Sequence, residues 1–166
     1  MALFSRLSLP LLSVAAVALA VPADAQTATA TLSANLGGLA KLSLSSTTLS
    51  FPDLDPDIVP QVPAAGGAIT ITAKARGTAG TTVALTVLAQ DDLRSGLNTI
   101  PASALTWTGS GGGFVNGTVS RLTPQVVASW SGSGIRTGAQ TFHFQNSWTY
   151  ATGTYSVSLL YTLVSP

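Results

Sequence analysis

An uninterrupted alternation of apolar and polar residues is the feature that most limits how this chain can fold. In TATATLSANL, residues 27 to 36, the even positions are Ala or Leu and the odd positions are Thr, Ser or Asn. Successive side chains of a β-strand point to opposite faces, so this segment has one apolar and one polar face. The same period returns up to the last residues, and no helical stripe interrupts it. We therefore expect an all-β protein.

The later strands follow from the same alternation, and Gly-rich turns separate them. Eight or nine short strands of this kind predict an antiparallel β-sandwich, immunoglobulin-like or jelly-roll-like. The inward face changes parity between Leu44 and Leu49, which predicts a bulge or bend at residues 45 to 47. The residues expected to point inward are Ala40, Leu42, Leu44, Leu49, Phe51, Ile69, Ile71, Ala73, Val83, Leu85, Val87, Leu105, Trp107, Val126, Ala128, Trp130, Phe142, Phe144, Tyr155, Val157, Leu159, Tyr161 and Leu163.

The N-terminal segment is typical of a secretory signal peptide. Arg6 precedes an apolar run that ends at Val21, and Ala23-Asp24-Ala25 has the small-x-small form of a cleavage site. The alternative, a membrane anchor, is disfavoured because the run is short for a bilayer. We expect residues 1–25 to be removed and residues 26–166 to form a single β-sandwich domain. The protein is then secreted, to the periplasm, the cell surface or the extracellular space.

The composition excludes several functions. Charged residues make up 8% of the chain and the net charge is +1, so no electrostatic surface for nucleic acid or anionic lipid is expected. The chain has no cysteine, which excludes disulfides, thiol catalysis and Cys-ligated zinc. A secreted domain without disulfides depends on packing or on partner subunits for its stability.

Three aspartates in FPDLDPDIVP, Asp53, Asp55 and Asp57, form the one acidic cluster of note. Calcium prefers several hard oxygens from a flexible loop, and Asp91 and Asp92 could join such a site. However, an EF-hand loop needs Gly and Glu where this chain has Ile58 and Ala64. A polar turn stiffened by proline is the simpler interpretation, and calcium at the three aspartates remains the alternative. No other cofactor is expected.

Few residues suit catalysis. The one histidine, His143, lies between two inward phenylalanines and should face solvent, and no GxSxG motif occurs. We therefore expect no enzymatic activity. Trp107 and Trp130 are in phase with apolar strand faces and should lie in the core. Trp148 and Tyr150 follow a polar segment, which makes them the candidate residues for stacking on a carbohydrate.

The C-terminal segment GTYSVSLLYTLVSP resembles the closing strand of secreted bacterial β-sandwich surface domains. Gly153-Thr154-Tyr155 is similar to the start of that strand in spore coat U-type and pilin domains. Tyr161-Thr162-Leu163, followed by Ser165-Pro166, is similar to the end of WxL domains, with Tyr in place of Trp. The cysteine pair of many pilin-type domains is absent, and so is the Leu of a first WxL motif after Trp107. The resemblance implies a non-enzymatic bacterial surface or fimbria-like subunit.

We therefore expect a cell-surface or extracellular structural or adhesive subunit that acts through its sheet edges and faces. The alternative is a carbohydrate- or calcium-dependent binding module. Residues 26–36 could pair with their own sheet, or they could cross to another subunit by β-strand addition, with Gly37-Gly38 as the hinge. Their small alanines favour the first option, and the complete alternation and the adjacent hinge favour the second.

Overall fold

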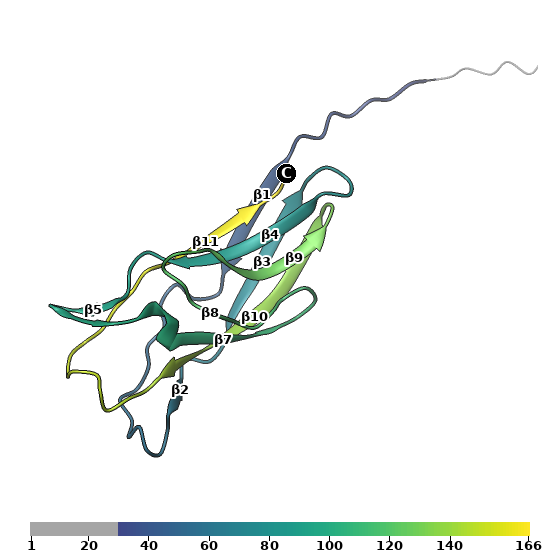
Figure 1. Cartoon of the computed structure of the whole chain (residues 1–166). Coiled ribbons are helices and arrows are strands. Elements are labelled where there is room, and N and C mark those ends of the chain that lie inside the picture. Colours follow the sequence, from purple (N-terminus) through teal and green to yellow (C-terminus); the bar gives the residue numbers. More distant parts are fainter. Residues whose placement is uncertain (1–29) are drawn as a thin grey trace, which may run out of the picture. The chain divides into compact units, whose positions relative to one another are not determined.

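The computed structural model describes residues 30–166, so the expected signal peptide and the start of the N-terminal strand lie outside the described residues (Figure 1). The protein is all-β, and its strands pair antiparallel. Among the described residues the only helix is the short 3-10 helix η1, so none could span a bilayer. The elements are β1 (Leu39–Leu44), β2 (Gln61–Pro63), β3 (Ile69–Arg76), β4 (Thr82–Ala89), β5 (Leu93–Ser95), β6 (Asn98–Ile100), η1 (Ala102–Ala104), β7 (Leu105–Ser110), β8 (Gly117–Thr118), β9 (Gln125–Ser131), β10 (Gly134–Gln145) and β11 (Leu159–Val164).

One sheet of the sandwich has six strands and is centred on the long strand β10. Its order is β1-β3-β10-β7-β8, and β2 pairs with the second half of β10. Pairing in register places Leu42 opposite Ala73 and Phe142 opposite Trp107. This sheet ends at β1 on one side and at β8 on the other.

The second sheet has three strands in the order β11-β4-β9, and β5 pairs with β6 as a separate ribbon. The register of β4 and β9 shifts between Leu85 and Thr86. Val127 is the extra residue of this bulge. Val127 and Ala128 are both buried, whereas Val126, on the other side of the bulge, is 46% exposed. The prediction that Val126 points inward was therefore wrong, because the extra residue shifts the alternation of the strand by one position.

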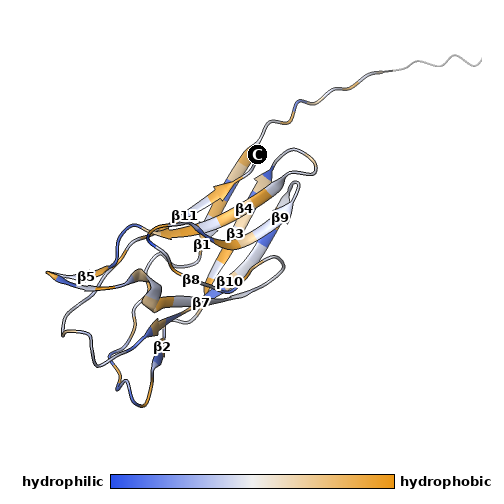
Figure 2. Ribbon diagram, in the orientation of Figure 1, coloured by the Kyte–Doolittle hydropathy of each residue, from blue (hydrophilic) through white to orange (hydrophobic). Residues whose placement is uncertain are grey.

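The core lies between the two sheets and contains most of the residues predicted from the alternation. Ile71, Ala73, Val83, Leu85 and Val87 are fully buried. Figure 2 shows the corresponding apolar stretches along β3, β4 and β11. Alternate side chains of β3 and β4 face this core, which is the pattern of a half-buried strand in each sheet.

Two further predictions can be compared with the structure. Both predicted core tryptophans are buried, with Trp107 at 2% and Trp130 at 7% exposure. The predicted N-terminal strand does not form in the described part of the chain: residues 30–38 belong to no strand, and all of them are exposed. Leu32 is 90% and Leu36 is 70% exposed. Whether this segment pairs with its own sheet or with another subunit stays a prediction.

Candidate functional site

The two sheets are joined along the edge where β8 and β9 lie. The segment between β7 and β8 crosses to β9, where the Val115 amide donates to the Val127 carbonyl at 3.0 Å and the Ser129 amide donates to the Gly113 carbonyl at 3.2 Å. Phe114 forms a bridge to Ala128 and is buried. We call this the closed edge, because backbone hydrogen bonds continue across it from one sheet to the other.

The opposite edge lies between β1 and β11, which run side by side in opposite directions (Figure 1). In the part of the chain that the structure describes, β1 pairs only with β3, and β11 pairs only with β4. Among the described residues no hydrogen bond joins β1 to β11. We call the line along which these two strands meet the open seam, since the backbone groups along it are unpaired within the described chain.

The side chains along the open seam are apolar and only half-buried. They pack against the core, and they contrast with the fully buried residues of β3 and β4 directly behind them. On one side of the seam they come from β1 and the segment after it: Leu42, Leu44, Leu49 and Phe51. On the other side they come from β11 and the segment before it: Tyr155, Val157, Leu159, Tyr161 and Leu163. The half-burial of both rows is what a sandwich shows where a strand is missing from its edge.

One side-chain hydrogen bond joins the sheets on the inner side of the open seam. Tyr161 on β11 donates its hydroxyl proton to Oε1 of Gln140 on β10, with an oxygen–oxygen distance of 2.6 Å. Gln140 is fully buried, and its Nε2 has no hydrogen-bond partner among the described residues. Burial raises the pKa of Tyr161 well above its usual value. The hydroxyl therefore stays protonated and keeps donating to Gln140 at neutral pH.

The chain enters and leaves the sandwich at the same end of the open seam. Leu39 at the start of β1 pairs with Arg76 at the end of β3. The carbonyl of Pro166 accepts a hydrogen bond from the Thr78 amide at 3.1 Å, in the turn that follows β3. The segment that precedes β1 is thus attached at one mouth of the seam. Residues 26 to 38 contain no charged side chain.

The three candidate calcium ligands lie on a turn and are exposed. The Asp57 amide donates to Oδ1 of Asp55 at 2.9 Å, and the amides of Ile58 and Val59 donate to the carbonyl of Asp55. These bonds are those of a polar turn. Within residues 30–166 no group of three carboxylate, His or Cys side chains is placed to hold a metal ion. Calcium binding at Asp53, Asp55 and Asp57 stays a prediction.

The two candidate carbohydrate contacts lie in different environments. Trp148 is 69% exposed. Tyr150 is half-buried and packs against Phe144, with ring centroids 5.8 Å apart, and Phe144 in turn packs against Phe51. Tyr150 therefore belongs to the aromatic margin of the core, and Trp148 alone offers an open ring face. His143 is half-buried on β10, opposite Thr106 and Pro63.

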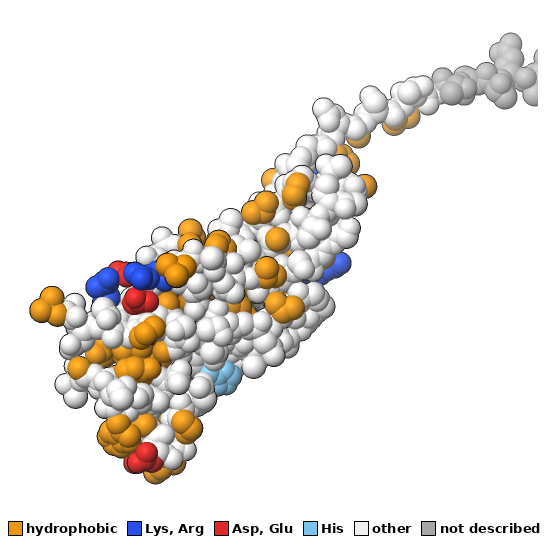
Figure 3. Space-filling model, viewed as in Figure 1, with side chains coloured by type: hydrophobic (Ala, Val, Ile, Leu, Met, Phe, Trp, Pro, Cys, Tyr) orange, Lys and Arg blue, Asp and Glu red, His pale blue; other side chains and the backbone are white. Residues whose placement is uncertain are grey.

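An ion cluster that the sequence did not reveal lies near β5 (Figure 3). Arg94 and Asp91 form an ion pair, which lowers the pKa of Asp91, and Arg121 lies 3.5 Å from Asp92. Asp92 also accepts a hydrogen bond from the Ala102 amide at 3.0 Å, at the start of η1. These contacts fasten η1 to two loops. Asp91 and Asp92 are thus engaged by arginines and give no support to a calcium site with Asp53.

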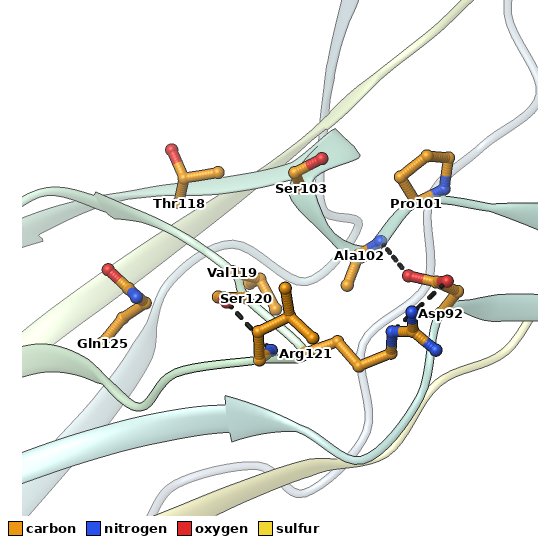
Figure 4. A pocket seen from close by; sticks show the side chains of 10 residues that line it. Asp92, Pro101, Ala102, Ser103, Thr118, Val119, Ser120, Arg121 and Gln125 are labelled. Atoms are coloured by element: carbon orange, nitrogen blue, oxygen red, sulfur yellow. Dashed lines mark hydrogen bonds and ion pairs between the residues drawn. The ribbon is translucent and has the colours of Figure 1, made fainter.

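A shallow hollow beside this cluster is the clearest pocket among the described residues (Figure 4). Its walls come from η1, from β8, from the segment between β8 and β9 and from the start of β9, and they include Ser103, Thr118, Arg121 and Gln125. The hollow is wide open, and the carboxylate and guanidinium groups beside it already pair with each other. Its side chains therefore look structural, and the open seam remains the better candidate for a functional site.

A comparison with known protein families finds no family whose sequence model matches this chain, and a comparison with curated proteins finds no match either.

Proposed function

We propose that this protein is a secreted, non-enzymatic structural or adhesive subunit of a bacterial surface or extracellular assembly, of a fimbria-like kind. It assembles by β-strand addition: residues 26–36 of one subunit enter the open seam of the next. The observation that carries this proposal is the seam itself, where two unpaired strand edges and two half-buried apolar rows face each other.

The chain supplies a segment that matches the seam. Residues 27–36 alternate perfectly, so one face could bury Leu32 and Leu36 while the other stays in water. The described part of this segment is exposed and unpaired. Because β1 and β11 approach each other closely, they would separate to admit it. A strand inserted between them would then complete the backbone hydrogen bonds of both and cover their half-buried side chains. The resemblance of the C-terminal strand to pilin-type domains agrees with this proposal.

Matched charge substitutions in the N-terminal segment test the proposal. Leu32→Asp places a carboxylate on the apolar face, whereas Ser33→Asp places it on the polar face one residue further on. Size-exclusion chromatography with light scattering on the chain that begins at Gln26 should show polymers for the parent and for Ser33→Asp, and monomers for Leu32→Asp. A parent chain that is monomeric at every concentration would refute strand addition.

Deleting residues 26–36 gives an independent test. We expect a folded monomer with the far-ultraviolet circular dichroism of an all-β domain, because the described sandwich forms without this segment. Loss of the folded domain on deletion would contradict the proposal, since it would mean that the segment is an essential strand of its own sandwich.

A binding module remains a second candidate function, and the exposure of Trp148 is the observation that favours it. Trp148 lies on a loop that Asn146 fastens to the aspartate turn, through a 2.7 Å hydrogen bond from Nδ2 to the Leu54 carbonyl. A flat exposed indole next to such a loop suits stacking on a sugar ring, with or without calcium. Retardation on polysaccharide gels that Trp148→Ala abolishes would support this function, and equal mobility of both proteins would oppose it.

A further inference from the structure

The geometry at Gly37 and Gly38 suggests how the open seam is regulated, an inference that rests on the proposed strand addition. The seam can in principle be filled by a neighbour's strand or by the chain's own. The chain's own segment joins β1 through these two glycines. Self-filling is therefore a β-hairpin, and its turn fixes which residues stand opposite each other.

The two arms of the hairpin must turn their apolar faces to the same side, and this requirement limits the registers in which they can pair. Residues directly opposite each other in an antiparallel pair point to the same face. Leu42 and Leu44 are the inward residues of β1. The even-numbered side chains of the N-terminal segment, such as Leu32 and Ala34, must therefore stand opposite even-numbered residues of β1 if the apolar face is to enter the seam.

The tightest hairpin fails this requirement. A two-residue turn made of Gly37 and Gly38 would place Leu36 opposite Leu39. Counting back along both arms, Ser33 would then stand opposite Leu42, and Thr31 opposite Leu44. The polar face would enter the seam and the leucines would face water. The Gly-Gly pair therefore cannot act as the two-residue turn that its sequence suggests.

A three-residue loop of Leu36, Gly37 and Gly38 meets the requirement. It places Ala34 opposite Ala40, Leu32 opposite Leu42, and Ala30 opposite Leu44. Such loops are a type I turn followed by a left-handed residue, and glycine is preferred at that third position. Gly38 occupies it here. Moving the loop by one residue would put Leu39 there, but Leu39 is extended in β1 and pairs with Arg76.

We propose that the chain closes its own seam in the register of the three-residue loop, and that Gly38 controls the balance between a closed monomer and the polymer. The closed form keeps Leu36 in the turn, outside the seam. A strand from another subunit needs no turn, so it can seat Leu36 as well as Leu32. The self-closed monomer is thus a protected but weaker state, and exchange between subunits replaces it.

The structure provides a matched pair of positions for testing this inference. In the open arrangement that it shows, neither Gly37 nor Gly38 has a positive φ. A Cβ at Gly37 would meet nothing within 4 Å, and one at Gly38 would lie 3.6 Å from the Arg76 carbonyl oxygen, an ordinary contact. A side chain at either position therefore fits the open form, and only Gly38 must be left-handed in the closed form.

The first experiment compares Gly38→Val with Gly37→Val in the chain that begins at Gln26. A valine at the left-handed position should lower the population of closed monomer about tenfold. Polymerisation followed by light scattering should then be about tenfold faster for Gly38→Val than for the parent, while Gly37→Val stays within about twofold of it. Equal rates for the two variants would overturn the inference.

The second experiment traps the register, which is simple because the chain has no cysteine of its own. Ala34→Cys with Ala40→Cys pairs residues that stand opposite each other in the three-residue loop. Asn35→Cys with Ala40→Cys pairs residues that would do so in the two-residue turn. Mild oxidation of the monomer fraction should give an intramolecular disulfide in the first variant and none in the second. The reverse result, or no disulfide in either, would refute self-closure.

The outcomes separate this inference from the proposed function. If Leu32→Asp abolishes the polymers but the glycine variants behave alike, strand addition stands and self-closure falls. If no polymer forms and the disulfide between positions 34 and 40 does, self-closure stands and strand addition falls. If neither polymer nor disulfide forms, both are wrong.

Discussion

The two edges of the sandwich border the same apolar core, but within residues 30–166 backbone hydrogen bonds join the two sheets at only one of them. At the closed edge, the segment that contains Phe114 crosses from one sheet to the other and supplies its own backbone hydrogen bonds. At the open seam, β1 and β11 lie side by side without any such bond among the described residues. The same alternation of side chains thus gives full burial at one edge and half-burial at the other. Whether the backbone groups of an edge strand are hydrogen-bonded therefore depends on which other segment reaches that edge. It does not depend on the sequence of the edge strand itself.

Truncating the closed edge should have the largest effect on stability. Phe114→Ala removes a buried ring between the sheets, and we expect the free energy of unfolding to fall by about 3–5 kcal/mol. Leu44→Ala, at the open seam, should cost less in the monomer because Leu44 is already half-exposed. Urea unfolding of the chain without residues 26–36 measures both. A larger loss for Leu44→Ala would reverse our description of the two edges.

A peptide that binds in the open seam should make the stability of that edge more similar to that of the closed edge. A peptide with the sequence of residues 26–36, added to the chain that lacks them, should raise the free energy of unfolding by about 2.7 kcal/mol at 100 times its dissociation constant. Hydrogen exchange should slow in β1 and β11 and stay unchanged in β8 and β9. A peptide with Asn at positions 32 and 36 is the control, and stabilisation by that control would point to unspecific binding.

The hydrogen bond between Tyr161 and Gln140 should contribute a smaller amount. Tyr161→Phe leaves both polar ends of a buried Gln140 side chain without a partner, at a cost of about 1–3 kcal/mol. Gln140→Leu combined with Tyr161→Phe should recover much of this loss, because no buried amide is then left unsatisfied. Thermal unfolding of the three variants is the measurement, and a double variant less stable than Tyr161→Phe would contradict this account.

The burial of Tyr161 makes the stability of the folded domain depend on pH. Folding raises the pKa of Tyr161 because the phenolate would be buried. The folded state therefore holds the proton more tightly than the unfolded state does. Its stabilising contribution is complete below the ordinary tyrosine pKa of about 10 and is lost as the pH rises above it. Unfolding followed from pH 8 to pH 11 should show this decline in the parent, and a smaller one in Tyr161→Phe.

Calcium should have the smallest effect, since the aspartate turn belongs to neither edge. The turn is held by its own backbone and by Asp55. We expect the melting temperature to be the same with millimolar calcium and with a chelator. A rise with calcium that is lost in Asp55→Asn would instead establish an ion site at Asp53, Asp55 and Asp57.

The sequence was sufficient to predict the strand faces but not the partners of the edges. Ile71, Leu85 and Phe142 are buried as their alternation predicted. The inward face of β9 was predicted wrongly at Val126, because a bulge depends on how two strands pair and leaves no clear mark on either one. The short strands β5 and β6 were not predicted, since three residues are too few to show a period.

The candidate site was beyond sequence reasoning for a related reason. Alternation predicts that Leu42 and Tyr161 point inward. Only the pairing of β1 with β3 and of β11 with β4 shows that both lie at an edge that no further described strand covers. The same alternation in residues 27–36 predicted a strand, and its described part pairs with nothing. Alternation of apolar and polar residues shows that one face of a strand must be buried. It does not show whether a segment of the same chain or of another chain buries it.

The side-by-side course of β1 and β11 has a mechanical consequence. A strand inserted between them would run antiparallel to one and parallel to the other, and its hydrogen bonds would point across the strand to both neighbours. Tension applied to that strand along its axis would load all of these bonds together, in shear, instead of opening them one after another from an end. A fibre assembled through the seam would therefore resist pulling far better than the same strands would resist being peeled apart.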